Sequence, residues 1–372
     1  MRRCAIALAV LAPVAVAAPA VAAPAVAATS VVTAGSLASL TGTATDYGIS
    51  QARGASLAAS QSGSVPGAKV RLILADDQSN TTMGRDQMIG FVGTRVSAVL
   101  GPTLSGVAAL ADPVAVASGI PVLAVTNTTL DITAAGKTVW RICLGENQMI
   151  PASVSYAKTS KGIRTAALVS VTGDAYSEGA AAQFRATAAA QGITLVADVS
   201  MPQGSSNAPS LLATAQAANP EAIFFAARDA DATHLLSASS GFTGVKVGGN
   251  GYNTLSVITA AGAAANGLIV SASWNPAKKD AASRAFVKAY MRKYPGDRPD
   301  AFAAQAYAGV QVLRAAVAVG KGTSATAVQR GLGRITSTRT VLGAITFPGR
   351  SHEASYPATV QQVSGGALGL AP

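Results

Sequence analysis

Small hydroxyl and amide side chains are the residues of this sequence best placed for chemistry. They gather in three short segments, each directly following or closing an apolar run: residues 101–106 (GPTLSG), 125–129 (VTNTT) and 248–253 (GGNGYN). Such side chains can donate and accept hydrogen bonds, so the segments predict contacts to a polar ligand. The alternative for each segment is that its Ser, Thr and Asn only cap the helix that follows.

Catalysis is not expected. The two histidines are His234, in a predicted helix, and His352, in a polar loop, and the cysteines are Cys4 and Cys143. The chain contains no Gly-x-Ser-x-Gly or His-Glu-x-x-His motif, and no nucleophile stands beside a base. We therefore predict a protein that is not an enzyme and needs no cofactor or metal.

The N-terminus has the order of a secretory signal. Arg2 and Arg3 precede an apolar stretch, and small residues follow as far as Ala28. Three prolines interrupt the stretch, which disfavours a membrane anchor. We predict a signal peptide over residues 1–28, cleavage near Ala27 or Ala28, and a periplasmic location. The mature chain then keeps one cysteine and no internal disulfide.

The charge is basic but dispersed. Lys and Arg number 28 against 17 Asp and Glu, a formal charge of +11, which becomes +9 without Arg2 and Arg3. The basic residues form no run and are not interleaved with aromatic residues, so nucleic acid is not an expected partner. A general attraction for anionic solutes accounts for the excess more simply.

Along the chain, β-rich runs alternate with Ala-rich amphipathic stretches, and the same alternation begins again after residue 150. This alternation predicts two α/β units with parallel strands. In such sheets ligands bind beyond the carboxyl ends of the strands, where the three polar segments lie. The predicted strands are 31–36, 70–75, 96–100, 122–125, 165–171, 194–199, 222–226, 245–248, 268–271, 344–347 and 358–363. Helices are predicted to begin near residues 47, 82, 105, 176, 209, 229, 280 and 302.

Nearly the whole mature chain resembles the periplasmic branched-chain amino-acid-binding proteins of ABC importers. The similarity is carried by residues 37–42 (LASLTG) with 47–48, by 74–79 (LADDQS), 99–102 (VLGP), 119–122 (GIPV), 140–141, 174–179 (DAYSEG), 218–225 (ANPEAIFF) and 266–268. The resemblance implies a type I periplasmic binding fold: two Rossmann-like lobes with parallel sheets, joined by three crossovers that act as a hinge. It implies lobe 1 over residues 29–143 plus 275–346 and lobe 2 over 144–274 plus 347–372.

The resemblance also assigns ligand contacts. Ser105 and Thr128 match the hydroxyl residues that hold a ligand carboxylate, with backbone groups of Thr126 and Asn127 beside them. Tyr47 and Tyr176 match aromatic residues at the mouth of the cleft, one from each lobe.

Two further matched positions depart from the family pattern. Asn250 stands where the family often has an acid that pairs with the ligand ammonium, and Arg228 stands where an aromatic residue is usual. An arginine in a cleft favours a carboxylate-rich ligand. Alternatively, Arg228 pairs with one of its neighbouring acids, Asp174, Asp229 or Asp231, and leaves the pocket. The same three acids and Asp46 can also supply a carboxylate to the ligand from another direction.

We therefore expect a monomeric solute-binding protein that delivers a small carboxylate-bearing ligand to an ABC permease in the inner membrane. An amino acid and an aromatic, keto or dicarboxylic acid are both open at this point. The rival function is an extracytoplasmic sensing module that signals to a membrane receptor, since the same clamp serves either task.

Overall fold

The computed structural model describes residue 1 and residues 30–61 and 68–372. The predicted signal peptide therefore lies outside the described residues, apart from its first residue. The first α/β unit follows the predicted alternation closely. Its elements are β1 (Val31–Ala38), α1 (Thr45–Ser60), β2 (Lys69–Asp76), α2 (Thr81–Gly93), β3 (Ala98–Leu100), α3 (Ser105–Ala117), β4 (Val122–Ala124), the 3-10 helix η1 (Leu130–Ala135) and β5 (Val139–Arg141).

The strands of this unit form one parallel sheet in the order β2-β1-β3-β4-β5. We call this sheet, with the helices packed on it, lobe 1. The central strands β3 and β4 are buried throughout and contain Val, Leu and Ala, as expected for strands covered on both faces. Each strand ends at the same edge of the sheet, and the loops that follow therefore gather there.

The second unit contains the larger, seven-stranded sheet. Its elements are α4 (Glu146–Lys161), β6 (Thr165–Thr172), α5 (Ala175–Ala190), β7 (Thr194–Pro202), α6 (Ala208–Ala217), β8 (Ala222–Ala226), α7 (Asp229–Ala238), β9 (Val245–Gly248), η2 (Asn250–Tyr252), α8 (Leu255–Ala261), η3 (Gly262–Ala265) and β10 (Ile269–Ala272). The last two strands of the chain, β13 (Thr359–Ser364) and β14 (Ala367–Leu370), join the same sheet.

This seven-stranded sheet has the order β14-β13-β10-β9-β8-β6-β7, and we call it, with its helices, lobe 2. Strands β6 to β10 pair in parallel, whereas β13 and β14 pair antiparallel at one edge. A parallel neighbour of β10 would need a crossover helix on the sheet of lobe 2. The chain instead reaches β13 by returning from lobe 1, and β13 pairs antiparallel with β10.

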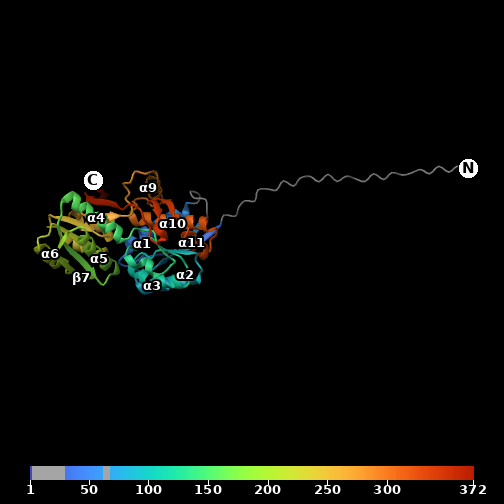
Figure 1. Cartoon of the computed structure of the whole chain (residues 1–372), viewed down its shortest axis with the longest axis horizontal. Helices are drawn as coiled ribbons and strands as arrows, with labels where there is room; N and C mark the ends of the chain where they lie inside the picture. Colours follow the sequence, from blue (N-terminus) through green and yellow to red (C-terminus); the bar gives the residue numbers. More distant parts are fainter. Residues whose placement is uncertain (2–29, 62–67) are drawn as a thin grey trace.

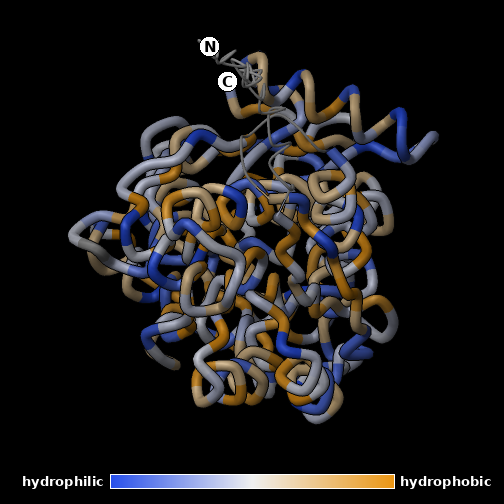
Figure 2. The backbone as a smooth tube through the Cα atoms, turned by 90° about the vertical axis from the view of Figure 1, so that its right-hand side faces the viewer, coloured by the Kyte–Doolittle hydropathy of each residue, from blue (hydrophilic) through white to orange (hydrophobic). Residues whose placement is uncertain are grey.

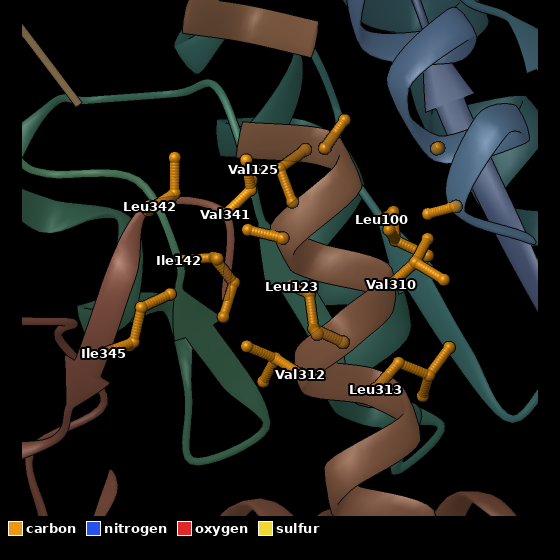
Figure 3. Close-up of a cluster of buried hydrophobic side chains, with 14 of the residues drawn as sticks. Leu100, Leu123, Val125, Ile142, Val310, Val312, Leu313, Val341, Leu342 and Ile345 are labelled. Atoms are coloured by element: carbon orange, nitrogen blue, oxygen red, sulfur yellow. The ribbon is translucent and has the colours of Figure 1, made fainter. Parts of the chain in front are cut away.

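The chain returns to lobe 1 between β10 and β13. The elements of this segment are α9 (Ala281–Lys293), α10 (Ala301–Gly320), α11 (Ala325–Leu332), the strand pair β11 (Ser337–Thr340) and β12 (Gly343–Thr346), and η4 (Pro348–Arg350). Helix α10 packs against α1 and α11. Figure 3 shows its apolar face, with Val310 and Leu313, against Leu100 and Leu123 of the first sheet. The same core includes Phe347, Ala354 and Tyr356.

Helix α10 is the one described helix whose length and composition would allow it to cross a membrane. In this structure 72% of its apolar window is buried inside the protein. It is therefore placed as the central helix of the lobe 1 core, and its hydrophobicity is explained by burial against α1 and the first sheet.

The chain crosses between the two sheets three times: before β6, after β10 and before β13. Figure 1 shows the two units side by side, with α5, α6 and β7 at one end and α2, α3 and α11 at the other. In Figure 2 hydrophobic and hydrophilic segments alternate along the backbone, the pattern of amphipathic elements packed into layers. The two α/β units predicted from the alternation are confirmed, and so is the two-lobed fold with three crossovers that the family resemblance implies.

Candidate functional site

A cavity lies between the two lobes, where the loops after their parallel strands meet. It has an empty volume of about 330 Å³. Lobe 1 contributes the loops after β3 and β4, helix α1 and the start of α10; lobe 2 contributes the start of α5 and the loops after β8 and β9. The lining residues are Tyr47, Thr103, Leu104, Ser105, Thr126, Asn127, Tyr176, Arg228, Asn250, Gly251 and Phe302.

The structure brings seven of the eight predicted site residues to this cavity. They are Tyr47, Ser105, Thr126, Asn127, Tyr176, Arg228 and Asn250. Thr128 is the exception: it is buried outside the lining, and its hydroxyl donates to Glu146 Oε1 over 3.1 Å. The hydroxyl assigned to a ligand carboxylate is thus engaged within the protein, and the structure does not support that role for Thr128.

Ser105 is the first residue of α3, and its position agrees with the predicted helix start. The residue before it, Leu104, provides no side-chain cap for the helix. The Ser105 hydroxyl makes no hydrogen bond within the described parts of the chain, although the residue is only 4% exposed. A free hydroxyl and uncapped backbone N–H groups therefore face the cavity together, an arrangement that favours an anionic group.

The loop that carries these groups is held by one buried amide. Gln51 Oε1 accepts from the hydroxyls of Thr103 and Thr126 over 2.9 and 3.0 Å, and Gln51 Nε2 donates to Leu37 O over 2.8 Å. At Gly101, where φ is +103°, a Cβ would stand 2.2 Å from Leu37 O, so the loop passes too close to β1 for any side chain. Gln51 does not line the cavity itself but holds two lining residues in place, and the sequence alone did not identify it.

Asn127 offers unused hydrogen-bonding capacity. It is 2% exposed and lines the cavity, yet neither atom of its side-chain amide has a partner among the described residues. Its backbone carbonyl accepts from the Cys143 thiol at 3.3 Å. Burial raises the pKa of that thiol to about 12, so Cys143 is an inert packing residue, as its apolar sequence context predicts.

The two predicted tyrosines meet the same loop of lobe 2. Tyr47, on α1 of lobe 1, donates to Gly251 O over 2.7 Å and accepts from the backbone N–H of Asp229 over 3.0 Å. Tyr176, on α5, accepts from Gly251 N over 2.7 Å. Burial raises the pKa of both hydroxyls well above the usual value, so both stay neutral. Through Tyr47 the two lobes are joined directly at the cavity.

Arg228 pairs with neighbouring acids, and it also lines the cavity. Its Nη2 lies 2.7 Å from Asp174 Oδ1, and its Nη1 pairs with Asp229 Oδ2. All three side chains are at most 10% exposed. Asp231 is engaged elsewhere, accepting from Gly204 N. Two carboxylates therefore face one guanidinium, which is the predicted alternative in which Arg228 pairs with neighbouring acids.

Glu146, which lies behind the cavity lining, is a second residue that sequence analysis missed. It is fully buried at the first position of α4, and its Oε1 accepts from Thr128 and, over 3.4 Å, from the backbone N–H of Asn250. Burial raises the pKa of Glu146 to about 7. One sequence signal could have found it: an acidic residue five positions after the end of β5, at the first crossover between the lobes.

Two α/β lobes that enclose a cavity with loops from both define a two-lobed ligand-binding protein. Residues 31–367 match the family model described as periplasmic binding protein, and the chain belongs to this family. It is 28% identical over 324 residues to the Leu/Ile/Val-binding protein homolog 3 of Brucella melitensis, covering 85% of this chain and 87% of the relative. A second relative, the Leu/Ile/Val-binding protein BraC3 of Rhizobium johnstonii, is also 28% identical, with the same coverage.

Solved structures agree with the fold. A leucine-binding protein, LivK, from Thermotoga maritima has a TM-score of 0.85 at 22% identity, over 92% of this chain and 98% of that one. LivJ from Streptococcus pneumoniae, in complex with isoleucine, scores 0.83 at 22% identity, over 91% and 97%. A solute-binding protein from Rhodopseudomonas palustris, in complex with benzoate, scores 0.81 at 21% identity, over 91% and 95%. The predicted family is confirmed, and its members here are binding proteins of transporters rather than enzymes.

Proposed function

We propose that this protein is the periplasmic solute-binding component of an ABC importer of the branched-chain amino-acid type. It captures a small carboxylate-bearing ligand between lobes 1 and 2 and passes it, as a monomer, to a permease in the inner membrane. The relatives support this proposal by their names, and the isoleucine and benzoate of the structural neighbours both carry a carboxylate. Residues 1–28 would direct export, and the hinge would lie near residues 143 and 274 and between Tyr356 of the lobe 1 core and β13.

The single observation that carries the proposal is the start of α3. There the Ser105 hydroxyl, which has no partner among residues 30–61 and 68–372, and the helix N-terminus without a side-chain cap lie at a cavity that both lobes line. Asn127 lines the same cavity, and its side-chain amide has no partner in the described parts of the chain. A carboxylate would satisfy these donors together, and hydrogen bonds to a charged group contribute about 1.5 to 3 kcal/mol each.

Calorimetry with matched acids and amides tests the proposal. We expect the mature protein to bind leucine or benzoate at least about tenfold more tightly than leucinamide or benzamide, because the neutral amide lacks the second anionic oxygen. Equal binding of an acid and its amide, or binding of neither acid, would contradict the carboxylate assignment. Thermal-shift screening extends the comparison to other acids, since a ligand that binds only the folded state raises its melting temperature.

A further inference from the structure

A series of buried side-chain amides leads from the cavity wall to the crossovers between the lobes. Its members are Asn250, Asn253, Gln361 and Asn275, which we call the amide relay, and none is more than 4% exposed. Asn250 lines the cavity, Gln361 lies on β13, and Asn275 follows β10 at the second crossover. An amide has one donating and one accepting end, so each hydrogen bond in the relay decides how the next amide is turned.

Backbone groups fix the far end of the amide relay. Asn275 Oδ1 accepts from the backbone N–H of Ala277 over 2.7 Å, and its Nδ2 donates to Leu368 O over 3.1 Å. Because a backbone N–H only donates and a backbone carbonyl only accepts, the two ends of this amide cannot be exchanged. Asn275 Nδ2 also donates to Gln361 Oε1, so Gln361 Nε2 is the end that donates onward.

Asn253 receives this hydrogen bond and is fixed a second time by the backbone. Its Oδ1 accepts from Gln361 Nε2 over 2.5 Å, and its Nδ2 donates to Ser271 O over 2.8 Å. The same Nδ2 donates to Asn250 Oδ1 over 2.9 Å. The carbonyl end of the Asn250 amide is therefore occupied within the protein, and exchanging its two ends would set one donor against another.

The Nδ2 of Asn250 is the end left for a ligand. Asn250 lines the cavity and is 4% exposed, and its Nδ2 makes no hydrogen bond among the described residues. An amide nitrogen donates hydrogen bonds and does not accept them, so this part of the wall presents a donor. A buried donor without a partner is costly, and an oxygen of the ligand would offset that cost.

The charges near Asn250 favour a neutral oxygen over a second carboxylate. The backbone N–H of Asn250 donates to Glu146 Oε1 over 3.4 Å, which places an acidic side chain directly behind this wall. The cation of the lining, Arg228, is already paired with Asp174 and Asp229. A second anionic group beside Asn250 would therefore be desolvated close to a carboxyl group and without a free cation to compensate it.

We propose that Asn250, held by the amide relay, is a specificity-determining residue that selects a ligand with a neutral oxygen acceptor, a carbonyl or hydroxyl oxygen, in addition to its carboxylate. This inference rests on the proposed function and narrows the ligand class of the same cavity. The α3 N-terminus takes the carboxylate from lobe 1, and Asn250 Nδ2 donates to the second oxygen from lobe 2. Asn253 does not line the cavity and is a positioning residue that acts through Asn250.

The experiment is calorimetry with pentanoate, 2-oxopentanoate and 4-oxopentanoate. These acids share a carbon skeleton, and the carbonyl is absent, next to the carboxylate or near the other end. We expect wild type to bind one of the oxo acids about three- to tenfold more tightly than pentanoate, the gain from one added hydrogen bond. Pentanedioate, which has a second carboxylate in place of the carbonyl, should bind no more tightly than pentanoate.

Two variants separate the donor from its support. Asn250→Leu removes the donor, so the oxo acid and pentanoate should bind about equally, with pentanoate affinity within about threefold of wild type. Asn253→Leu leaves the Asn250 amide free to turn over, so the preference should fall below about twofold. A merely structural role of Asn253 would weaken all the acids alike and leave their ratio unchanged. Gln362→Leu is the matched control, since Gln362 neighbours Gln361 on β13 but bonds to Gly267 O outside the relay.

The outcomes separate this inference from the proposed function. Wild type that binds leucine or benzoate but binds pentanoate at least as tightly as both oxo acids, or prefers pentanedioate to both, or binds none of these short acids, overturns the inference and leaves the carboxylate site standing. An oxo-acid preference that persists in Asn250→Leu, or a full preference in Asn253→Leu, overturns the role of the relay. If wild type binds none of the acids, leucine and benzoate included, the proposed function fails as well.

Discussion

Hydroxyl groups in and next to the cavity wall divide into two kinds, those with a partner in the protein and those without one. Those of Thr103 and Thr126 donate to Gln51 and hold the loops in place, and that of Thr128 donates to Glu146. Ser105 alone of these four leaves its hydroxyl without a partner among the described residues. A buried polar group without a protein partner is expected to meet a ligand, so the carboxylate contact is assigned to Ser105.

Replacing Ser105 should therefore weaken ligand binding without harming the fold. We expect Ser105→Ala to reduce leucine affinity by about tenfold or more, because one hydrogen bond to a charged group is lost. Ser118→Ala, at the exposed C-terminal end of the same helix, is the control and should bind like wild type. Isothermal titration of both variants makes the comparison, and equal affinities would remove Ser105 from the site.

The residues that sequence analysis placed correctly are those whose position depends on a single loop. Ser105, Thr126 and Asn250 follow strands, and the rule that parallel strands end at one edge brings them together. Pairing is different, because it depends on which side chains approach in three dimensions. Asp174 reaches Arg228 across 54 positions of sequence, and Glu146 meets Asn250 across 104. Sequence analysis names Asp174 among the acids that could pair with Arg228, whereas nothing in the spacing of Glu146 and Asn250 predicts their contact.

Among the elements, the packing of α10 on α1 depends on glycine. A Cβ added to Gly54 would lie 2.0 Å from the backbone oxygen of Ala303, so the two helices approach as closely as the backbone permits. Strands β1 to β4 and the start of α3 were predicted to within two residues because their apolar runs are clear. Helices α4, α8 and α11 and strands β5, β11 and β14 were missed. Most of these are short segments that carry little periodicity, and the longer α4 contains Pro151, which is typical of a helix end rather than of a helix interior.

Substitution at Gly54 should separate α1 from α10. We expect Gly54→Ala to lower the free energy of unfolding by about 1 to 3 kcal/mol, as forced overpacking does. Gly90→Ala on α2 is the control: no atom lies within 4 Å of its added Cβ, so the better helix propensity of Ala should stabilise the protein by up to about 1 kcal/mol. Urea denaturation measures both. A stable Gly54→Ala variant would show that the helices can move apart freely.

At the scale of the whole molecule, lobe 1 and lobe 2 have separate cores and meet at the cavity. The hydrogen bonds of Tyr47 to Gly251 and Asp229 span this meeting point, so the described arrangement is a closed one. Closure would bury the ligand between the α3 N-terminus and the loops of lobe 2, and opening would have to break the Tyr47 contacts first.

Removing the Tyr47 hydroxyl should speed ligand release. Tyr47→Phe leaves a buried N–H and a buried carbonyl without partners in the closed form, a cost of about 1 to 3 kcal/mol. We expect the leucine dissociation rate to rise about tenfold in stopped-flow measurements. Tyr294→Phe removes a tyrosine hydrogen bond to Arg53 O within lobe 1 and should leave the rate unchanged. Equal rates in wild type and Tyr47→Phe would mean that Tyr47 does not hold the lobes together.

The central claim, that two lobes close on a small carboxylate, is tested most directly by small-angle X-ray scattering of the mature protein with and without saturating leucine. Hinge closure brings the lobes together, so the account predicts a smaller radius of gyration and a monomeric mass in the presence of leucine. If calorimetry shows leucine bound while the radius of gyration stays the same, the ligand does not close the lobes and the clamp account is wrong.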